Sequence, residues 1–193
     1  MTDALATSAP ATSLPRPWLK HYPPGVPGDV AVDTYTSLVP LLEESWMRYA
    51  KRDAAACMGV RFTYGLIDER SKSLGAWLQS QGVQRGDRVA VMMPNVPQYL
   101  VAIGAVLRVG GVVVNVNPLY TPRELQHQLA DSGATVIIVL ENFAHTLEAV
   151  IAKTDVRHVV LASMGDMLGF AKGQLVNFLL RHIKKMVPEF RLP

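Results

Sequence analysis

Residues 110–125 constrain the fold of this chain most strongly, because they combine the signals of a strand, a turn and a helix start. Residues 112–116 are nearly all valine, with a glycine pair before them and an Asn-Pro pair after them. Such a run predicts a short strand buried on both faces. Thr121 then fits an N-cap, Pro122 the first helical position and Glu124 the third residue of a capping box. The stretch therefore predicts a strand–turn–helix unit.

The same alternation of apolar runs and helical patterns extends along the chain. Further strands are expected at residues 54–60, 88–93, 135–140 and 158–162. Helices are expected at residues 37–50, 65–81, 96–109, 122–132 and 142–153. Strands that alternate with helices pair in parallel through right-handed crossovers, with helices on both faces. The sequence therefore predicts an α/β fold, with a mostly parallel sheet flanked by helices and residues 112–116 as a central strand.

Two further helix starts carry capping signals. Thr63 precedes the helix expected at residues 65–81 and is a suitable N-cap, and Gly82 is suited to end that helix. Asn95 and Gln98 stand three residues apart at the start of the next helix, which permits a second capping box.

Composition divides the chain into four segments. Residues 1–17 are rich in Ala, Thr, Ser and Pro, without the features of a signal peptide or an anchor, so we expect a disordered tail. Residues 18–36 combine prolines with aromatic residues, which predicts an extended lead-in across a domain surface. Residues 37–170 carry the α/β pattern. Residues 171–193 are expected to form a basic amphipathic helix and a truncated end.

Composition also excludes several classes of protein. With 49% hydrophobic residues, the chain can bury one sizeable core. A net charge of +3 is too weakly basic to indicate nucleic-acid binding without a patterned patch, and zinc-finger and RNA-binding signatures are absent. Cys57 is the single cysteine, which excludes an internal disulfide framework and favours a reducing compartment. We therefore expect a cytoplasmic protein without a nucleic-acid partner.

Other site chemistries are also disfavoured. The apolar region 96–116 could suggest a membrane span, but Arg108, the glycine pair and the valine run oppose one continuous helix. A dinucleotide site needs a G-x-G-x-x-G turn after its first strand, and Pro-Asn-Val-Pro follows Met93 instead. This weakens the alternative of a nucleotide-binding oxidoreductase domain. The histidines lie on different expected elements without metal-ligand spacing: His127, His145 and His158.

Residues 172–187 form a basic amphipathic pattern. One helical face carries apolar residues: Leu175, Val176, Leu179, Ile183, Met186 and Val187. The basic residues lie mostly on the other face and are candidate membrane contacts: Lys172, Arg181, Lys184 and Lys185. Such a helix can lie in the interface of an anionic membrane, with its cations at the lipid head groups. The alternative is that the apolar face packs on the rest of a larger protein.

The string Asn-Pro-Leu-Tyr-Thr-Pro-Arg-Glu-Leu at residues 117–125, followed by His127 and by Asp-Ser-Gly-Ala at 131–134, carries a specific resemblance. It resembles the N-terminal third of bacterial long-chain fatty-acid-CoA ligases, in the adenylate-forming (AMP-dependent) acyl-CoA synthetase superfamily. The phrase at residues 86–95 is similar across that superfamily, and Met-Gly-Asp at 164–166 is a further specific point. The resemblance implies the first subdomain of the N-terminal domain of these enzymes.

The resemblance implies an enzyme that joins a fatty acid to coenzyme A with ATP and Mg²⁺, by way of an acyl-adenylate. In that family the phosphate-binding loop, the metal motif, the ribose-binding motif and the mobile lysine all come after the matching region. We therefore assign no catalytic, cofactor-binding or metal-binding residue to this chain and expect it to be inactive and to bind no cofactor alone.

The resemblance also suggests where the chain acts and with what. Bacterial members are similar in associating peripherally with the inner face of the cell membrane, and the expected partners are the remainder of the ligase, a fatty acid and an anionic membrane surface. An incomplete sheet domain with exposed apolar surface could also form a homodimer. A non-catalytic α/β module that binds a lipid or a protein partner remains the main alternative.

Overall fold

The computed structural model describes residues 15–192, and the chain divides into two units, residues 1–36 and 37–193. Most of the tail expected at residues 1–17 lies outside the described residues. In the first unit, Pro17–His21 forms a 3-10 helix (η1), so the expectation that this segment is extended throughout is wrong. Proline occupies the start of η1, and the Arg16 carbonyl accepts the Leu19 N–H at 3.1 Å. A proline in the first turn loses no helical hydrogen bond, which permits this short helix.

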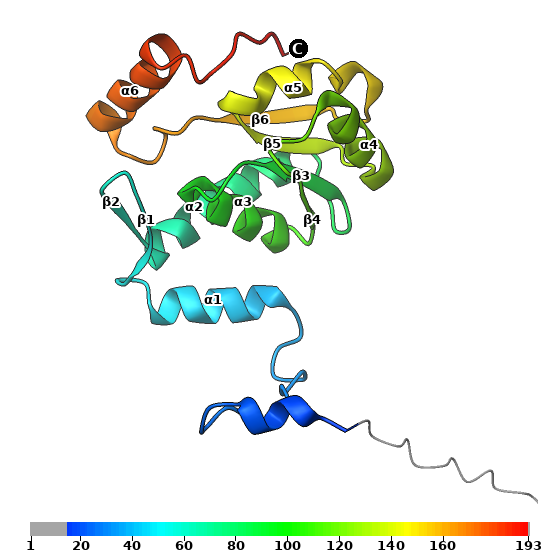
Figure 1. Ribbon diagram of the computed structural model, residues 1–193, viewed down its shortest axis with the longest axis vertical. Coiled ribbons are helices and arrows are strands. Elements are labelled where there is room, and N and C mark those ends of the chain that lie inside the picture. The colour runs from blue at the N-terminus through cyan, green and yellow to red at the C-terminus, as the bar shows by residue number, and fades with distance from the viewer. Residues whose placement is uncertain (1–14, 193) are drawn as a thin grey trace, which may run out of the picture. The chain divides into compact units, whose positions relative to one another are not determined.

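The second unit contains a four-stranded parallel sheet, as expected from the strand–helix alternation (Figure 1). Its strands are β3 (Arg88–Met92), β4 (Val112–Asn115), β5 (Val136–Leu140) and β6 (His158–Ala162). They lie in the order β4-β3-β5-β6, and every neighbouring pair is parallel. All residues of β5 are buried, because β5 lies between two strands and has helices on both sides. The predicted mostly parallel α/β fold is confirmed.

Strand β4 lies at an edge of the sheet, and the prediction of a central strand buried on both faces is wrong. β3 pairs with β4 on one side and with β5 on the other, whereas β4 pairs with β3 alone within the described residues. Val112 is 47% exposed. Val113 and Val114 still pack on opposite faces of the sheet, against two different core clusters. The valine run indicates that β4 packs in apolar surroundings, but it does not indicate how many strands pair with β4.

The strand expected at residues 54–60 is instead a two-stranded antiparallel hairpin. It consists of β1 (Asp53–Cys57) and β2 (Val60–Thr63), which form a sheet of their own. The chain reverses at Met58 and Gly59, whose φ angles are 49° and 74°. Glycine adopts this left-handed conformation readily, so Gly59 makes a tight turn possible where an apolar run suggested one continuous strand.

The two faces of the parallel sheet are covered by different helices (Figure 1). α2 (Tyr64–Ser80) and α3 (Pro97–Arg108) pack over one face, where they bury the side chains of Val89 and Val91. α4 (Pro122–Ser132) and α5 (Ala144–Glu148) pack over the other face, where they bury Ala90 and Met92. Alternate residues of β3 therefore serve two cores, as the two-residue period of a strand requires.

Two of the three capping sites that the sequence predicted are confirmed. The Thr63 hydroxyl accepts the Leu66 N–H at 3.2 Å, and the full capping box of Thr121 and Glu124 opens α4, as predicted. The capping box proposed for Asn95 and Gln98 is wrong. Val96 is the N-cap of α3 and makes no side-chain cap. The Gln98 side chain instead donates to the Ser163 carbonyl at 2.8 Å, and so ties α3 to the segment after β6.

The helix expected at residues 142–153 is broken into three short pieces. A 3-10 turn at Glu141–Phe143 (η2) leads into α5, and a second 3-10 turn follows at Ile151–Lys153 (η3). Val150 is buried in the same core cluster as Leu147, and its N–H reaches the Leu147 carbonyl at 3.0 Å. Hydrogen bonds between residues three positions apart tighten the segment, so that the side chains of Leu147 and Val150 both reach the core.

α1 (Leu38–Arg48) buries less than its apolar pattern suggested. Trp46 is the one buried residue of this helix, while Leu38 and Leu41 are exposed. Trp46 packs against Gly104 of α3. The guanidinium of Arg108 stacks over the Trp46 ring and binds Asp68 of α2 and, at 2.6 Å, Glu43 of α1. One tryptophan and one arginine thus hold α1 against α2 and α3.

The C-terminal helix is shorter than the expected span of residues 172–187. α6 (Phe170–Phe178) continues into a π-helical turn at Leu179–Ile183 (η4), and helical structure stops there. Lys185 has a φ of 49°. A right-handed helix needs negative φ angles, so it cannot extend through this residue. Among residues 15–192, no helix is long and apolar enough to cross a membrane.

Candidate functional site

α6 is fixed beside the carboxyl end of β6 by a close contact between two glycines. The backbones of Gly165 and Gly173 approach so closely that a Cβ on Gly173 would lie 2.4 Å from the Gly165 carbonyl oxygen. The Asn177 side chain accepts the Gly165 N–H at 2.8 Å, and Asn177 is buried. Gly173 and Asn177 are therefore the buried residues of α6, and one of the apolar residues that the sequence pattern suggested, Val176, is partly buried against the cluster around Trp46 and Phe62.

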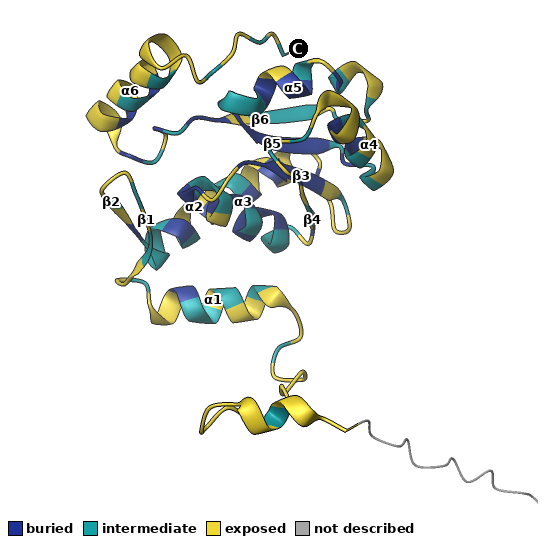
Figure 2. Ribbon diagram, in the orientation of Figure 1, coloured by how far each residue is buried: buried dark blue, intermediate teal, exposed yellow. Residues whose placement is uncertain are grey.

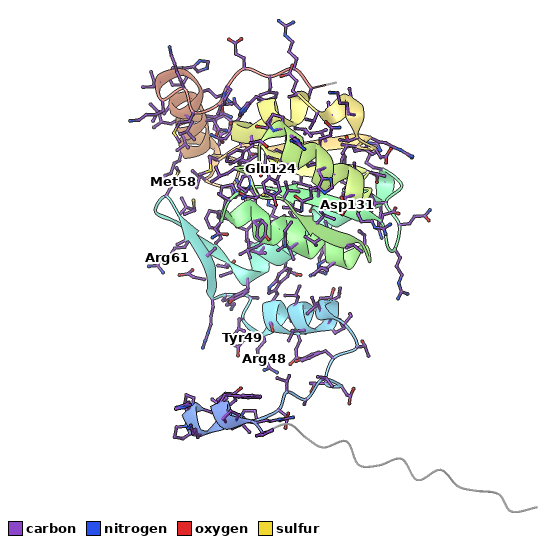
Figure 3. The ribbon with its side chains drawn as sticks, turned by 45° about the vertical axis from the view of Figure 1, so that its right-hand side comes forward. Arg48, Tyr49, Met58, Arg61, Glu124 and Asp131 are labelled. Carbon is purple, nitrogen blue, oxygen red and sulfur yellow. The ribbon has the colours of Figure 1, made fainter. Side chains whose placement is uncertain are left out.

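Two of the four predicted membrane-contact cations are engaged within the protein. The Lys172 ammonium donates to the carbonyl of Met58, at the tip of the β1–β2 hairpin, and so ties α6 to that hairpin. Met58 is labelled at this tip in Figure 3. Arg181 binds the carboxylate of Glu141 with two nitrogens, at 2.9 and 2.7 Å. These two residues therefore have structural partners in the described chain.

Glu141 is a buried acid that sequence reasoning missed. It follows β5 directly, its side chain is only 3% exposed, and it is the partner of Arg181. Arg181 also donates to the Ser163 hydroxyl at 3.0 Å, so it links the ends of β5 and β6 to η4. One carboxylate oxygen of Glu141 is buried without a hydrogen-bond partner among the described residues. An acid directly after an all-apolar strand was the signal available in the sequence.

The other two cations are exposed and lie beside exposed apolar side chains. Lys184 and Lys185 are exposed, after the end of η4. We call the neighbouring residues the C-terminal apolar surface: Phe170, Leu175, Phe178, Leu179, Ile183 and Met186, which are between 39% and 88% exposed. Figure 2 shows this exposure along α6. Lys184, Lys185 and these six apolar residues are thus exposed, whereas Lys172 and Arg181 have partners within the protein.

A cleft lies on the same side of the sheet as α2 and α3, next to β6. Its volume is about 470 Å³. Its walls come from α2 and α3, its floor from β5 and β6, and one end from the loop after β6. The lining is mainly apolar and includes Leu66, Leu74, Val101, Ile138, Val160 and Met167. Arg70, Ser73 and Asp166 also line the cleft, and all three are exposed. No single motif in the sequence marks this cleft, because its residues come from five separate segments.

The string at residues 117–125 has a structural role in the turn from β4 to α4. The Asn117 side chain accepts the Leu119 N–H at 3.0 Å, which shapes the turn. Glu124 accepts hydrogen bonds at 2.8 Å from both the backbone N–H and the hydroxyl of Thr121. These two bonds, the backbone bond first, lower the pKa of Glu124 below its ordinary value. The residues that carry the family resemblance are thus also the ones that start α4.

The described residues offer no metal cluster. Within residues 15–192, His, Cys, Asp and Glu do not form any group of three or more that could hold a metal ion. Cys57 is a free cysteine and is half-buried in the β1–β2 hairpin. It packs with the cluster around Trp46 and Phe62.

Comparison with known proteins agrees with the sequence resemblance. Residues 42–188 match the AMP-binding enzyme family. The chain is 54% identical over 177 residues to a long-chain-fatty-acid–CoA ligase of Yersinia pestis, and equally to one of Escherichia coli O157:H7. Both alignments cover 91% of this chain and 32% of the relative. The chain thus spans about a third of the length of the curated relatives it matches, at their N-terminal end.

Solved structures agree as well. A long-chain-fatty-acid-CoA ligase from Archaeoglobus fulgidus superposes with a TM-score of 0.60 at 27% sequence identity. The superposition covers 65% of this chain and 27% of that one. The family match extends over most of the sequence, and the parallel sheet that it implies is present. The chain therefore belongs to the AMP-binding enzyme family.

Proposed function

We propose that this chain acts as the N-terminal portion of an AMP-forming long-chain fatty-acid-CoA ligase. The observation that carries the proposal is the 54% identity to such ligases over 91% of the chain. The whole enzyme would form an acyl-adenylate from a fatty acid and ATP, with release of pyrophosphate. Coenzyme A would then displace AMP to give the acyl-CoA.

The described residues do not fit the nucleotide and Mg²⁺ of that reaction. They provide no cluster of carboxylates for Mg²⁺. α3, which starts directly after the central strand β3, opens with Val96 and Pro97 rather than with a glycine-rich loop that could cradle phosphates. We therefore assign no reaction step to this chain. Its contribution is a folded support, the parallel sheet with its helices, for the part of the enzyme that carries the chemistry.

The proposal is tested by fatty-acid-dependent exchange of pyrophosphate into ATP. The assay compares the 193-residue chain with a chimera in which this chain replaces the matching N-terminal third of the Yersinia pestis ligase. We expect exchange by the chimera and none by the 193-residue chain. Exchange by the short chain would show that it holds the adenylating groups itself, and a folded but silent chimera would contradict the assignment to this ligase family.

We further propose that the C-terminal apolar surface contacts the cytoplasmic face of an anionic membrane. Ile183 and Met186, which flank Lys184 and Lys185 in the chain, are 61% and 56% exposed and support this contact, because lysines favour anionic head groups while apolar side chains favour the acyl region. The same surface could instead bind a protein partner or a second copy of the chain. It would give the chain a role even without catalysis, as a lipid- or partner-binding module.

The membrane contact is tested by sedimentation with vesicles that contain anionic lipid. The double variant Lys184→Glu/Lys185→Glu should bind less than the wild-type chain. Lys153→Glu/Arg157→Glu, which changes two exposed cations elsewhere by the same charge, is the matched control. Arg181 is not used, because its loss would leave the buried Glu141 charge without its partner. Equal binding by all three proteins would contradict the membrane contact, and size-exclusion chromatography of the same samples would reveal self-association.

A further inference from the structure

The segment that follows α6 is attached to the rest of the chain at two neighbouring points. Arg181 binds the carboxylate of Glu141, and the Met186 carbonyl accepts a side-chain N–H of Asn142 at 2.9 Å. Glu141 and Asn142 are consecutive residues directly after β5. Residues 182–185, which lie between the two attachments, are all exposed. The protein therefore presents these four side chains on a short segment that is held at both ends.

The presented segment combines basic side chains with an exposed apolar one. In chain order it consists of His182, Ile183, Lys184 and Lys185. Ile183 is 61% exposed. Residues 179–188 contain no acidic residue. Two lysines therefore give the segment its positive charge, and a proton on His182 would add a third cation to it.

The imidazole of His182 has an aromatic neighbour but no polar partner in the described part of the chain. The centroids of the His182 and Phe178 rings are 5.0 Å apart, and the rings are tilted by 46°. Within residues 15–192 the imidazole makes no hydrogen bond and no ion pair. An aromatic ring attracts a nearby cation, so Phe178 does not oppose a charged imidazole. No hydrogen bond within these residues therefore fixes His182 in its neutral form.

Charged groups on the elements around η4 already have other partners. These pairs are Lys172 of α6 with the Met58 carbonyl, Glu141 of η2 with Arg181, and Asp166 of the loop after β6 with the Ser163 N–H. Glu189 is the nearest acid along the chain, seven positions after His182, and it forms no ion pair with His182 in the described structure. The proton on His182 is therefore controlled by the pH and by any anionic surface that approaches the segment.

We propose that protonation of His182 regulates the membrane contact, so that the chain binds an anionic membrane more tightly as the pH falls. This inference rests on the proposed membrane contact. Histidine changes its charge between about pH 5 and 8, whereas lysine stays charged across that range. Below neutral pH the segment thus offers three cations to the lipid head groups, while the side chain of Ile183 can enter the apolar region.

The direction and the size of the effect follow from the charge that the proton adds. An anionic surface attracts the charged form of His182 and not the neutral one, so binding strengthens as the histidine becomes protonated and weakens as it loses the proton. The surface also concentrates protons near itself, which favours the charged form at the membrane. One further basic charge beside such a surface should strengthen binding about fivefold.

Sedimentation with vesicles at two pH values tests this regulation. The 193-residue chain is mixed with vesicles of phosphatidylcholine and phosphatidylglycerol in equal amounts, at about pH 5.5 and about pH 7.5. The wild-type chain should bind about fivefold more tightly at the lower pH. His182→Gln should bind weakly at both pH values, and His182→Lys should bind tightly at both. His127→Gln, which removes an exposed histidine on α4, is the matched control and should keep the wild-type dependence on pH.

The results separate the regulation from the membrane contact itself. Wild-type binding that is equal at both pH values, or a pH dependence that persists in His182→Gln, would overturn the regulation and leave the membrane contact in place. No binding by either the wild type or His182→Lys would contradict both. Circular dichroism at both pH values checks that each variant is folded. An equal response to pH with vesicles of phosphatidylcholine alone would also overturn the regulation, because these vesicles carry no net charge for the imidazolium to meet.

Discussion

Asn177 of α6 accepts the backbone N–H of Gly165 at 2.8 Å and so fixes the C-terminal helix to the loop after β6. The two glycines at this crossing, Gly165 and Gly173, leave no room for a side chain. These small and polar groups and the partly buried Val176 occupy the inward side of α6, whereas Phe170, Leu175 and Phe178 are exposed. The exposed C-terminal apolar surface is thus a consequence of how α6 is attached.

Replacing Gly173 by alanine should detach α6. The new Cβ would lie 2.4 Å from a backbone oxygen, which cannot rotate away as a side chain would. We expect a loss of about 1–3 kcal/mol in the free energy of unfolding. Hydrogen exchange should accelerate in residues 170–178. Gln174→Ala, at the next and exposed position, is the control. Unchanged exchange in Gly173→Ala would contradict the role of this crossing.

Arg181→Met should destabilise the chain through the charge that it leaves behind. Glu141 is buried and Arg181 is its ion-pair partner. A buried charge without a partner costs more than the pair contributed. Because Arg181 is half exposed, we expect the free energy of unfolding, measured in urea, to fall by about 2 kcal/mol. The double variant Arg181→Met/Glu141→Gln should recover most of this loss. Lys184→Met should have little effect, and equal losses in all three variants would argue against the pair.

Local signals in the sequence predicted local structure well. Thr121, Pro122 and Glu124 act within one turn of helix, and the structure places all three as the sequence predicted. The strand–helix alternation also predicted the parallel sheet. Each of these features depends on residues that are close together in the chain, so composition and spacing carry the information.

Features that depend on distant residues were not predictable in this way. The edge position of β4 depends on which strands pair with β3, and nothing in residues 112–116 encodes that choice. Arg181 and Glu141 are 40 positions apart, so the sequence did not indicate that Arg181 has an ion-pair partner at the end of β5. The cleft beside β6 combines five separate segments and left no signal in any one of them.

Gly104→Ala should disturb the packing of α1. A Cβ on Gly104 would lie 2.6 Å from the ring of Trp46. Alanine in a helix interior otherwise stabilises by about 1 kcal/mol relative to glycine, while overpacking costs about 1–3 kcal/mol. We therefore expect a net loss of about 1 kcal/mol. The rigid tryptophan ring has little freedom to move aside without displacing α1.

The fluorescence of Trp46 reports this displacement directly. Trp46 is 7% exposed, whereas the other two tryptophans, Trp18 and Trp77, are 51% and 38% exposed. Gly104→Ala should therefore shift the emission to longer wavelength as Trp46 becomes exposed to water. Leu100→Ala, at an exposed position of α3, should leave the emission unchanged. A more stable Gly104→Ala protein with unshifted emission would show that the contact can relax.

The capping box of α4 should give the chain a measurable dependence on pH. Thr121→Ala removes the cap and should cost about 1 kcal/mol in unfolding free energy. The Thr121 backbone and hydroxyl lower the pKa of Glu124 below its ordinary value of 4.5. A lowered pKa means that the ionised form is favoured in the folded state. The stability it contributes is therefore present above the ordinary value and is lost as the pH falls through the lowered pKa.

Near neutral pH, Glu124→Gln should thus lower the free energy of unfolding relative to the wild type. In acid this difference between the two proteins should disappear. Urea unfolding of wild type and Glu124→Gln at about pH 7 and about pH 3 measures the difference. Glu69→Gln, an exposed acid on α2, is the matched control and should change little at either pH. In the Thr121→Ala background, part of the Glu124→Gln effect should persist, because the Thr121 backbone N–H still donates to Glu124. A Glu124→Gln effect of the same size at both pH values would show that its carboxylate charge does not stabilise the start of α4.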